Sequence, residues 1–160
     1  MLVRYPGNGA PVSYLDTTAN EEDGKFSPDG RWIAYTSDES GTREVYVQPF
    51  LPGVAPASRP RWRISTRSGG KPLWSREGKE LFYIAGDHNL MSVQVKSAAP
   101  GVFESSVPQI LFLTRLEPSD TGQQYAVSPD GRAIFLLQPL DAVLSSPLTI
   151  VLNWTGLPGR

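Results

Sequence analysis

Few residues in this chain could carry nucleophilic catalysis. Among its 160 residues there is one histidine, His88, and there is no cysteine. A Ser-His-Asp triad needs a histidine beside an exposed serine on a strained turn, and no Gly-x-Ser-x-Gly pattern supplies one. His88 instead lies within Gly86-Asp87-His88-Asn89, a composition typical of a solvent-facing hairpin turn. We therefore expect no catalytic residue in this chain.

Metal chemistry would have to rely on carboxylates, because cysteine is absent and one histidine is too few. The acidic clusters are Glu21-Glu22-Asp23 and Asp38-Glu39. Paired acids can bind calcium or the amino terminus of a peptide, but a calcium loop needs several converging oxygens, and the Asp-x-Asp-x-Asp spacing is missing. We interpret both clusters as solvated loops and expect neither a metal nor a cofactor.

The candidate binding residues lie in a stretch without acidic residues, between Glu44 and Glu77. Its basic and tryptophan residues are Arg59, Arg61, Trp62, Arg63, Arg67, Lys71, Trp74 and Arg76. Bases interleaved with aromatic residues can bind nucleic acid or an acidic protein. The strict alternation around Trp62 favours an outer strand with one solvent face, ahead of an acidic protein partner and of nucleic acid. The candidate binding residues are Arg61, Trp62, Arg63 and Arg67.

Composition and charge exclude further classes. Fifteen Lys plus Arg and sixteen Asp plus Glu give a formal net charge of −1, which does not fit a polycation that binds nucleic acid. The chain is 39% apolar and 19% charged, an ordinary globular balance. No apolar run approaches the roughly twenty residues of a membrane span, and Pro6 and Gly7 interrupt the start before a signal peptide could form.

A ten-residue pattern occurs three times, at 26–35, 74–83 and 127–136. Each copy has a bulky apolar residue, a serine, two turn residues, a glycine, a basic residue and then a largely apolar run. The glycines are Gly30, Gly78 and Gly131, so the copies are 48 and 53 residues apart. Periods of about 40 to 50 residues that contain several short strands are typical of propeller blades.

The centre of the pattern, Ser-Pro-Asp-Gly, predicts a hairpin turn. Proline presets φ, aspartate can bond its own backbone, and glycine takes the left-handed conformation. Asp29 and Asp130 are therefore interpreted as turn residues and not as catalytic acids, and the second copy supports this because it has Glu77 there.

Strands are predicted through each repeat, and no stretch shows a sustained helical period. The expected strands are 25–27, 31–36, 44–47 and 62–66, then 72–74, 81–85, 90–95 and 109–114, then 124–127, 132–137 and 148–154. Residues 11–15 are expected to form a further outer strand, and the four tryptophans to pack between blades. The prediction is one all-β domain over 1–160, a partial β-propeller of about three four-stranded antiparallel blades with incomplete first and last blades.

These repeats resemble those of TolB-type, WD-repeat-like propellers. The resemblance rests on Ser-Pro-Asp-Gly-Arg-Trp-Ile-Ala-Tyr followed by Asp-Glu-Ser-Gly and Glu-Val-Tyr-Val, and it covers residues from about 11 to 157. The runs at 69–83 and 145–154 are similar to the C-terminal propeller regions of bacterial eukaryotic-type serine/threonine protein kinases. Kinase catalysis is not implied, because the chain lacks the Gly-rich loop, His-Arg-Asp and Asp-Phe-Gly.

The resemblance implies a non-catalytic protein-interaction or ligand-sensing module of a bacterial signalling protein. The alternative is the gating propeller of an S9-type serine peptidase without its hydrolase domain. A third possibility, a carbohydrate hydrolase, would need acids around a central pocket, which three incomplete blades are not expected to enclose on their own. The location would be cytoplasmic for a complete chain and extracytoplasmic for part of a receptor-kinase-like protein.

Three blades would leave apolar faces open, and exposed faces of this kind usually bind a partner. For a complete chain we expect a homodimer that closes a six-bladed ring, with residues 11–15 of one copy completing the last blade of the other. The expected partners are thus an unidentified protein and a second copy, without nucleic acid and without a membrane segment.

Overall fold

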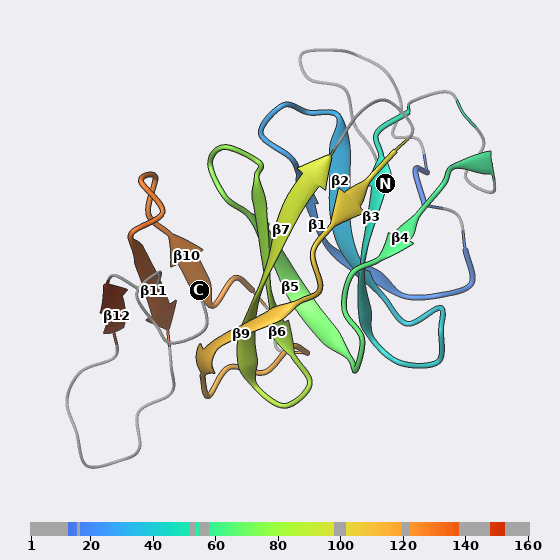
Figure 1. Ribbon diagram of the computed structural model, residues 1–160. Helices are drawn as coiled ribbons and strands as arrows, with labels where there is room; N and C mark the ends of the chain where they lie inside the picture. Colours follow the sequence, from blue (N-terminus) through green and yellow to red (C-terminus); the bar gives the residue numbers. More distant parts are fainter. Residues whose placement is uncertain are drawn as a thin grey trace, which may run out of the picture.

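The computed structural model describes residues 13–15, 17–51, 54, 58–97, 102–119, 122–137 and 148–152. Apart from a 3₁₀ turn at Ser58, the regular structure of these residues consists of strands. The strands form antiparallel sheets that follow one another along the chain (Figure 1). The chain is an all-β, partial β-propeller, as the repeats predict.

The first sheet, called blade 1, has the strand order β1-β2-β3-β4. Its strands are β1 (Glu21–Phe26), β2 (Trp32–Ser37), β3 (Glu44–Pro49) and β4 (Trp62–Arg63). The outer strand β4 is only two residues long, shorter than the predicted 62–66. Ile64 still donates its amide to the Val45 carbonyl at 2.8 Å, but the Val45 amide donates to the Ser65 hydroxyl at 2.7 Å and not to a backbone carbonyl, so the ladder ends there. Cross-strand pairs such as Tyr35 and Tyr46 fix the register.

The second sheet, blade 2, is built around β7 (Asn89–Ser97), which has strands on both of its edges. The inner strands β5 (Gly69–Trp74) and β6 (Glu80–Ala85) precede it. On its other edge β7 pairs with both β8 (Glu104–Ser105) and β9 (Gln109–Leu113). The predicted outer strand at 109–114 is confirmed, whereas the short β8 was not predicted because two residues carry no periodicity.

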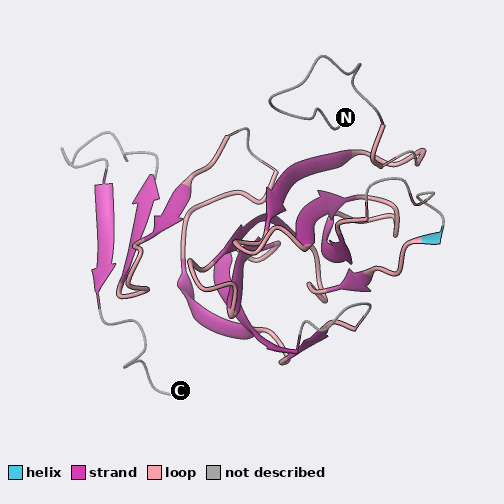
Figure 2. Ribbon diagram, turned by 90° about the horizontal axis from the view of Figure 1, so that it is seen from above, coloured by secondary structure: helices cyan, strands magenta, loops and turns pink. Residues whose placement is uncertain are grey.

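The third sheet, blade 3, contains β10 (Tyr125–Val127), β11 (Ala133–Leu137) and β12 (Leu148–Leu152). Seen from above, it stands at one end of the molecule (Figure 2). Its described part has three strands, and residues 153–154 of the predicted last strand lie outside the described residues. The three described strands of blade 3 agree with the predicted incomplete last blade, whereas blade 2 has five strands, one more than the predicted four.

The predicted outer strand at 11–15 is wrong for its described part. Residues 13–15 form no strand, and residues 11–12 lie outside the described residues. The segment is held by its side chains instead of by a ladder: the Tyr14 hydroxyl donates to the Pro49 carbonyl at 3.0 Å and accepts from the Leu51 amide at 3.1 Å. Tyr14 is buried against blade 1.

The repeated turn has the same hydrogen bonds in blades 1 and 3. The Ser27 hydroxyl donates to Asp29 at 2.5 Å and accepts from the Trp32 amide at 3.0 Å, while Asp29 accepts from the Arg31 amide. The corresponding bonds in blade 3 join Ser128, Asp130, Arg132 and Ala133. The hydroxyl of Ser128, and then the Arg132 amide, lower the pKa of Asp130. Asp29 and Asp130 are thus turn residues, as predicted.

The second copy of the turn keeps only part of this network. The Ser75 hydroxyl accepts from the Glu80 amide at 3.1 Å, and the Gly78 amide donates to the Ser75 carbonyl at 2.9 Å. Glu77 pairs with Lys79 at 2.7 Å on the surface. The serine and the glycine therefore determine the turn, and the acid between them is replaceable.

Consecutive blades pack face to face. We call the face of a blade toward the preceding blade its N-side face, and the face toward the following blade its C-side face. The equivalent outward faces of blades 1 and 3 keep the same names. The cluster between blades 1 and 2 includes Trp32, Ala34, Val45, Val47, Trp74, Leu81 and Tyr83. The cluster between blades 2 and 3 includes Phe82, Ile84, Leu90, Tyr125, Ile134 and Leu136. Strand β6 is thus buried on both faces, as its apolar run predicts.

Three of the four tryptophans pack between blades 1 and 2, as predicted, and Trp154 lies outside the described residues. The Phe103 ring lies among them, with centroid distances of 5.2 Å to Trp32, 5.9 Å to Trp62 and 6.4 Å to Trp74. Trp74 also donates its indole N–H to the Lys25 carbonyl at 3.1 Å, which links the inner strands of the two blades. These rings fill the wedge between neighbouring sheets.

Replacing Gly30 or Gly131 by alanine should lower the free energy of unfolding by about 1–2 kcal/mol. Both glycines have left-handed φ, +70° and +68°, and an added Cβ would contact nothing within 4 Å, so the cost comes from the backbone alone. Urea denaturation measures it. The matched control is Gly24→Ala in β1, where φ is not positive and an added Cβ would make an ordinary 3.6 Å contact. Equal stability of all three variants would contradict the turn geometry.

Candidate functional site

His88 occupies the hairpin turn between β6 and β7, as its sequence context predicts. Its amide donates to the Ala85 carbonyl at 3.0 Å, and its φ of +65° is left-handed. The imidazole Nδ1 lies 3.1 Å from the Leu116 carbonyl and 3.5 Å from Glu117, with the side chain 41% exposed. The described residues contain no cluster of three or more His, Asp and Glu side chains that could hold a metal ion.

The acidic residues Glu21, Glu22 and Asp23 lie in strand β1, so their interpretation as a solvated loop is wrong. A strand forms here because β1 pairs with β2 from Glu21↔Ser37 to Phe26↔Ile33. Each carboxylate also has a partner in the chain. Glu21 accepts from the Thr17 hydroxyl, Asp23 pairs with Lys71, and Arg43 forms an ion pair with Glu22 and lowers its pKa.

The second acidic cluster lies on the turn between β2 and β3, as predicted. Asp38 accepts from the backbone amide and the side-chain amide of Asn20, at 2.9 Å and 2.7 Å. These bonds lower the pKa of Asp38. Glu39 pairs with Arg61 at 2.9 Å. Both acids therefore hold neighbouring segments of blade 1.

The basic stretch does not form one continuous face. Arg59 is buried, with its guanidinium 3.8 Å from the Tyr14 ring centroid and a bond of 2.6 Å to the Tyr14 carbonyl. Lys71 is 2% exposed and points into the molecule. The sequence could not show this, because the Tyr14 partner of Arg59 and the Asp23 partner of Lys71 each lie more than forty residues away along the chain.

The candidate binding residues separate into two places. Arg61, just before β4, and Arg63, on β4, are exposed, while Trp62 lies between them and packs on Trp32 with ring centroids 5.7 Å apart. This is the predicted alternation, and it makes Trp62 part of the core between blades. Arg67 lies on the loop between β4 and β5, where it lines a separate groove of about 680 Å³. A binding role for these arginines stays a prediction.

A polar chain links the inner strands of all three blades. The Lys71 ammonium lies 3.1 Å from the Asp23 carboxylate, and the Tyr125 hydroxyl donates to the Lys71 carbonyl at 2.6 Å. Asp23 and Lys71 sit at β-bulges with φ of +57° and +60°. Bulges re-aim a side chain, and these two direct the charges toward each other across the boundary between blades. The sequence indicates that Asp23 and Lys71 occupy equivalent positions in the repeat, because each lies four positions before a repeat serine, Ser27 or Ser75.

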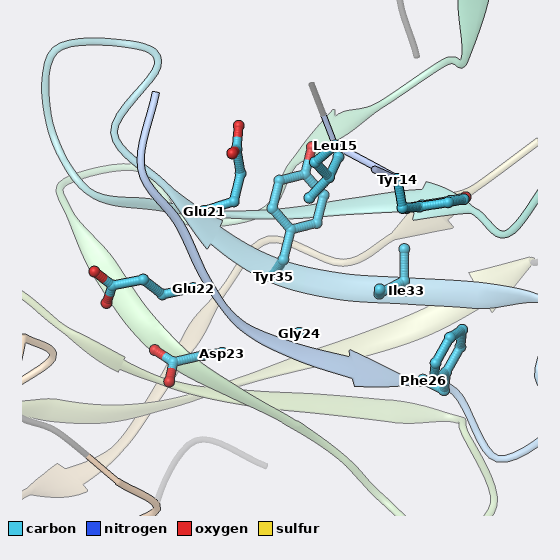
Figure 3. Close-up of a pocket in the computed structure, with 9 residues that line it drawn as sticks. All are labelled: Tyr14, Leu15, Glu21, Glu22, Asp23, Gly24, Phe26, Ile33 and Tyr35. Carbon is cyan, nitrogen blue, oxygen red and sulfur yellow. The ribbon is translucent and has the colours of Figure 1, made fainter. Parts of the chain in front are cut away.

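A groove of about 400 Å³ lies on the N-side face of blade 1 (Figure 3). Glu21, Glu22 and Asp23 occupy one end of it, while Phe26 and Ile33 lie at the other (Figure 3). Sequence reasoning missed this groove, because it is formed where the segment with Tyr14 and Leu15 approaches β1 and β2. It is a hollow in a sheet face, apolar at one end and charged at the other.

The opposite end of the molecule has an uncovered apolar face. On β11, Phe135 is 36% exposed and Leu137 is 59% exposed, whereas the alternate residues Ile134 and Leu136 are buried against blade 2. Ala126 on β10 and Gln123 share the shallow surface formed there. This is the C-side face of blade 3. Together, the groove on blade 1 and the apolar face of blade 3 are the candidate interaction surfaces.

No protein-family model and no curated protein matches the chain. Solved structures similar to it include an oligogalacturonate lyase from Vibrio parahaemolyticus, with 17% sequence identity and a TM-score of 0.46 over 69% of this chain and 26% of that one. TolB from Acinetobacter baumannii is similar with 14% identity and a TM-score of 0.37, over 87% of this chain and 45% of that one. The chain thus spans less than half of either protein. Likeness of this degree carries no information about activity. The described residues include no helix that is long and apolar enough to cross a membrane.

Replacing Asp23 by asparagine should lower the free energy of unfolding by about 3 kcal/mol, because Lys71 would remain charged and buried without its partner. Adding Lys71→Met should recover part of this loss, since it removes the buried charge. Chemical denaturation of both single variants and the double variant measures the coupling. In the matched control, Glu77→Gln in the exposed pair with Lys79, we expect no measurable change. Independent, additive effects at Asp23 and Lys71 would contradict a coupled pair.

Proposed function

We propose that this chain is a non-catalytic protein-interaction module, a set of propeller blades that binds a protein partner through an uncovered blade face. The observation that carries this proposal is the exposure of Phe135 and Leu137 on blade 3. The corresponding residues of blade 2, Phe82 and Ile84, are fully buried by the next blade. Apolar side chains that a blade normally buries favour association when they are exposed.

The chemistry of the described residues supports a role without catalysis. His88 bonds a backbone carbonyl, and the carboxylates of Glu22 and Asp23 pair with Arg43 and Lys71. The turn acids Asp29 and Asp130 bond their own turns. Each group is thus accounted for by a structural contact, which leaves it poorly placed to transfer a proton or attack a substrate.

The resemblance of the repeats to the propeller regions of bacterial eukaryotic-type kinases supports a place in bacterial signalling. In such a protein the blades would bind a partner while another domain performs the catalysis. Fold alone does not determine function, so this part of the proposal rests on the sequence resemblance at 69–83 and 145–154.

A photo-crosslinking amino acid at position 137 tests the interaction role. We expect the variant Leu137→p-benzoylphenylalanine to form an adduct, either with a second copy or with another protein, that excess unmodified chain suppresses. The control carries the same amino acid at Val107, which is 79% exposed on the loop between β8 and β9. No adduct at position 137 beyond that at position 107 would overturn the proposal.

Absence of turnover is tested on the purified chain with ATP, a chromogenic peptide and a chromogenic ester. We expect no turnover above buffer. Activity that disappears with a single substitution, at His88 for example, would contradict the non-catalytic role, since a contaminating enzyme would not respond to that change.

A further inference from the structure

The repeats determine which residues of each blade contact the preceding blade. They are the residue before the repeat serine and those six and eight positions after it. In blade 2 these are Trp74, Leu81 and Tyr83, and in blade 3 they are Val127, Ile134 and Leu136. Both sets pack against the preceding blade. The equivalent residues of blade 1 are Phe26, Ile33 and Tyr35, which line the groove of its N-side face.

The residues of each blade that contact the following blade are also set by the repeats. They lie seven and nine positions after the repeat serine: Phe82 and Ile84 in blade 2, and Phe135 and Leu137 in blade 3. In blade 2 they are buried by blade 3. In blade 3 they are exposed. The chain therefore has the two halves of one interface at its opposite ends, and blade 2 lies between them.

From these equivalent positions we infer that the C-side face of blade 3 docks into the groove on blade 1 of a second copy. This inference rests on the proposed interaction function and names its partner. The contact repeats, between two molecules, the packing that already joins blades 1 and 2 and blades 2 and 3. Two such contacts, related by a two-fold axis, close a ring of six blades, within the range of four to eight that propellers adopt.

The open part of the groove has the right chemistry for Phe135 and Leu137. Tyr35 is itself buried, and Tyr14 and Leu15 line the groove with it. At the end of the groove away from the carboxylates, Phe26 is 48% exposed, with its cross-strand partner Ile33 beside it (Figure 3). Phe26 has the repeat position of Trp74, the ring that fills the wedge between blades 1 and 2. An aromatic residue at this place is therefore suited to pack against an incoming blade.

The polar ends of the two surfaces are also complementary. Where blades 1 and 2 meet, the Asp23 carboxylate accepts from Lys71, and both residues lie four positions before a repeat serine. The residue of blade 3 at this position is Gln124. Across the proposed contact, Gln124 of one copy lies next to Asp23 of the other, and a side-chain amide can donate to a carboxylate. In the proposed ring, each contact between blades would thus have polar residues on the first strands and apolar residues on the second strands.

Sedimentation equilibrium and light scattering test this inference with three variants. The unmodified chain should have twice the mass of 17.5 kDa. Leu137→Glu alters the blade 3 face, and Phe26→Glu alters the blade 1 groove; each should raise the dimer Kd at least about tenfold. Val107→Glu places the same charge on an exposed apolar residue away from both faces and should leave the dimer intact. Circular dichroism and thermal melts of each variant check that the fold is kept.

Mixing the two weakened variants distinguishes this head-to-tail contact from other dimers. The Leu137→Glu copy keeps its groove and the Phe26→Glu copy keeps its blade 3 face, so a mixture should form a dimer through one intact contact. A symmetric contact between two blade 3 faces would not be affected by Phe26→Glu and would not be restored by mixing, and either result overturns the inference. A monomeric unmodified chain at high concentration also overturns it. Adducts with another protein at position 137 would then leave the proposed interaction function standing without this partner.

Discussion

A sheet that is apolar on both faces has to be covered on both faces, and the arrangement of this molecule follows from that requirement. The central strand β6 has Leu81, Phe82, Tyr83 and Ile84 in succession, each 1% exposed or less. Alternation sends Leu81 and Tyr83 toward blade 1 and the other two toward blade 3. Blades 1 and 3 each satisfy one face of this sheet, and each then has a second face of its own. The outward faces of blades 1 and 3 are therefore the places where further apolar surface remains to be covered.

Charge in this protein serves mainly to join segments that are distant in sequence. Lys71 and Asp23 are 48 residues apart and meet where two inner strands face each other. Arg59 reaches across 45 residues to the Tyr14 carbonyl. A buried cation is tolerated only when it is paired and hydrogen-bonded, so these contacts constrain how the blades and the N-terminal segment fit together. The bases that read as a binding stretch in the sequence are thus divided between the interior and the surface.

The two candidate surfaces differ in how far other residues of the chain cover them. The groove of blade 1 is partly covered by Tyr14 and Leu15 and has carboxylates at one end, each with a partner inside the chain. On the blade 3 face, by contrast, Leu137 is 59% exposed. The proposed contact between these two unlike surfaces would be directional, from blade 3 of one copy to blade 1 of the other.

The sequence by itself determined the local structure: the serine-to-glycine turns, the strands after them, their antiparallel pairing and hence the all-β, repeating architecture. Those features depend on residues within about ten positions of each other, such as Ser27, Asp29 and Gly30, whose hydrogen bonds are formed within the turn. Only the tertiary structure decided which charges are buried, why Glu21–Asp23 form a strand and not a loop, and where the groove lies. These depend on contacts such as Asp23 with Lys71 and Tyr14 with Pro49, and no local pattern encodes the distance between residues that far apart along a chain.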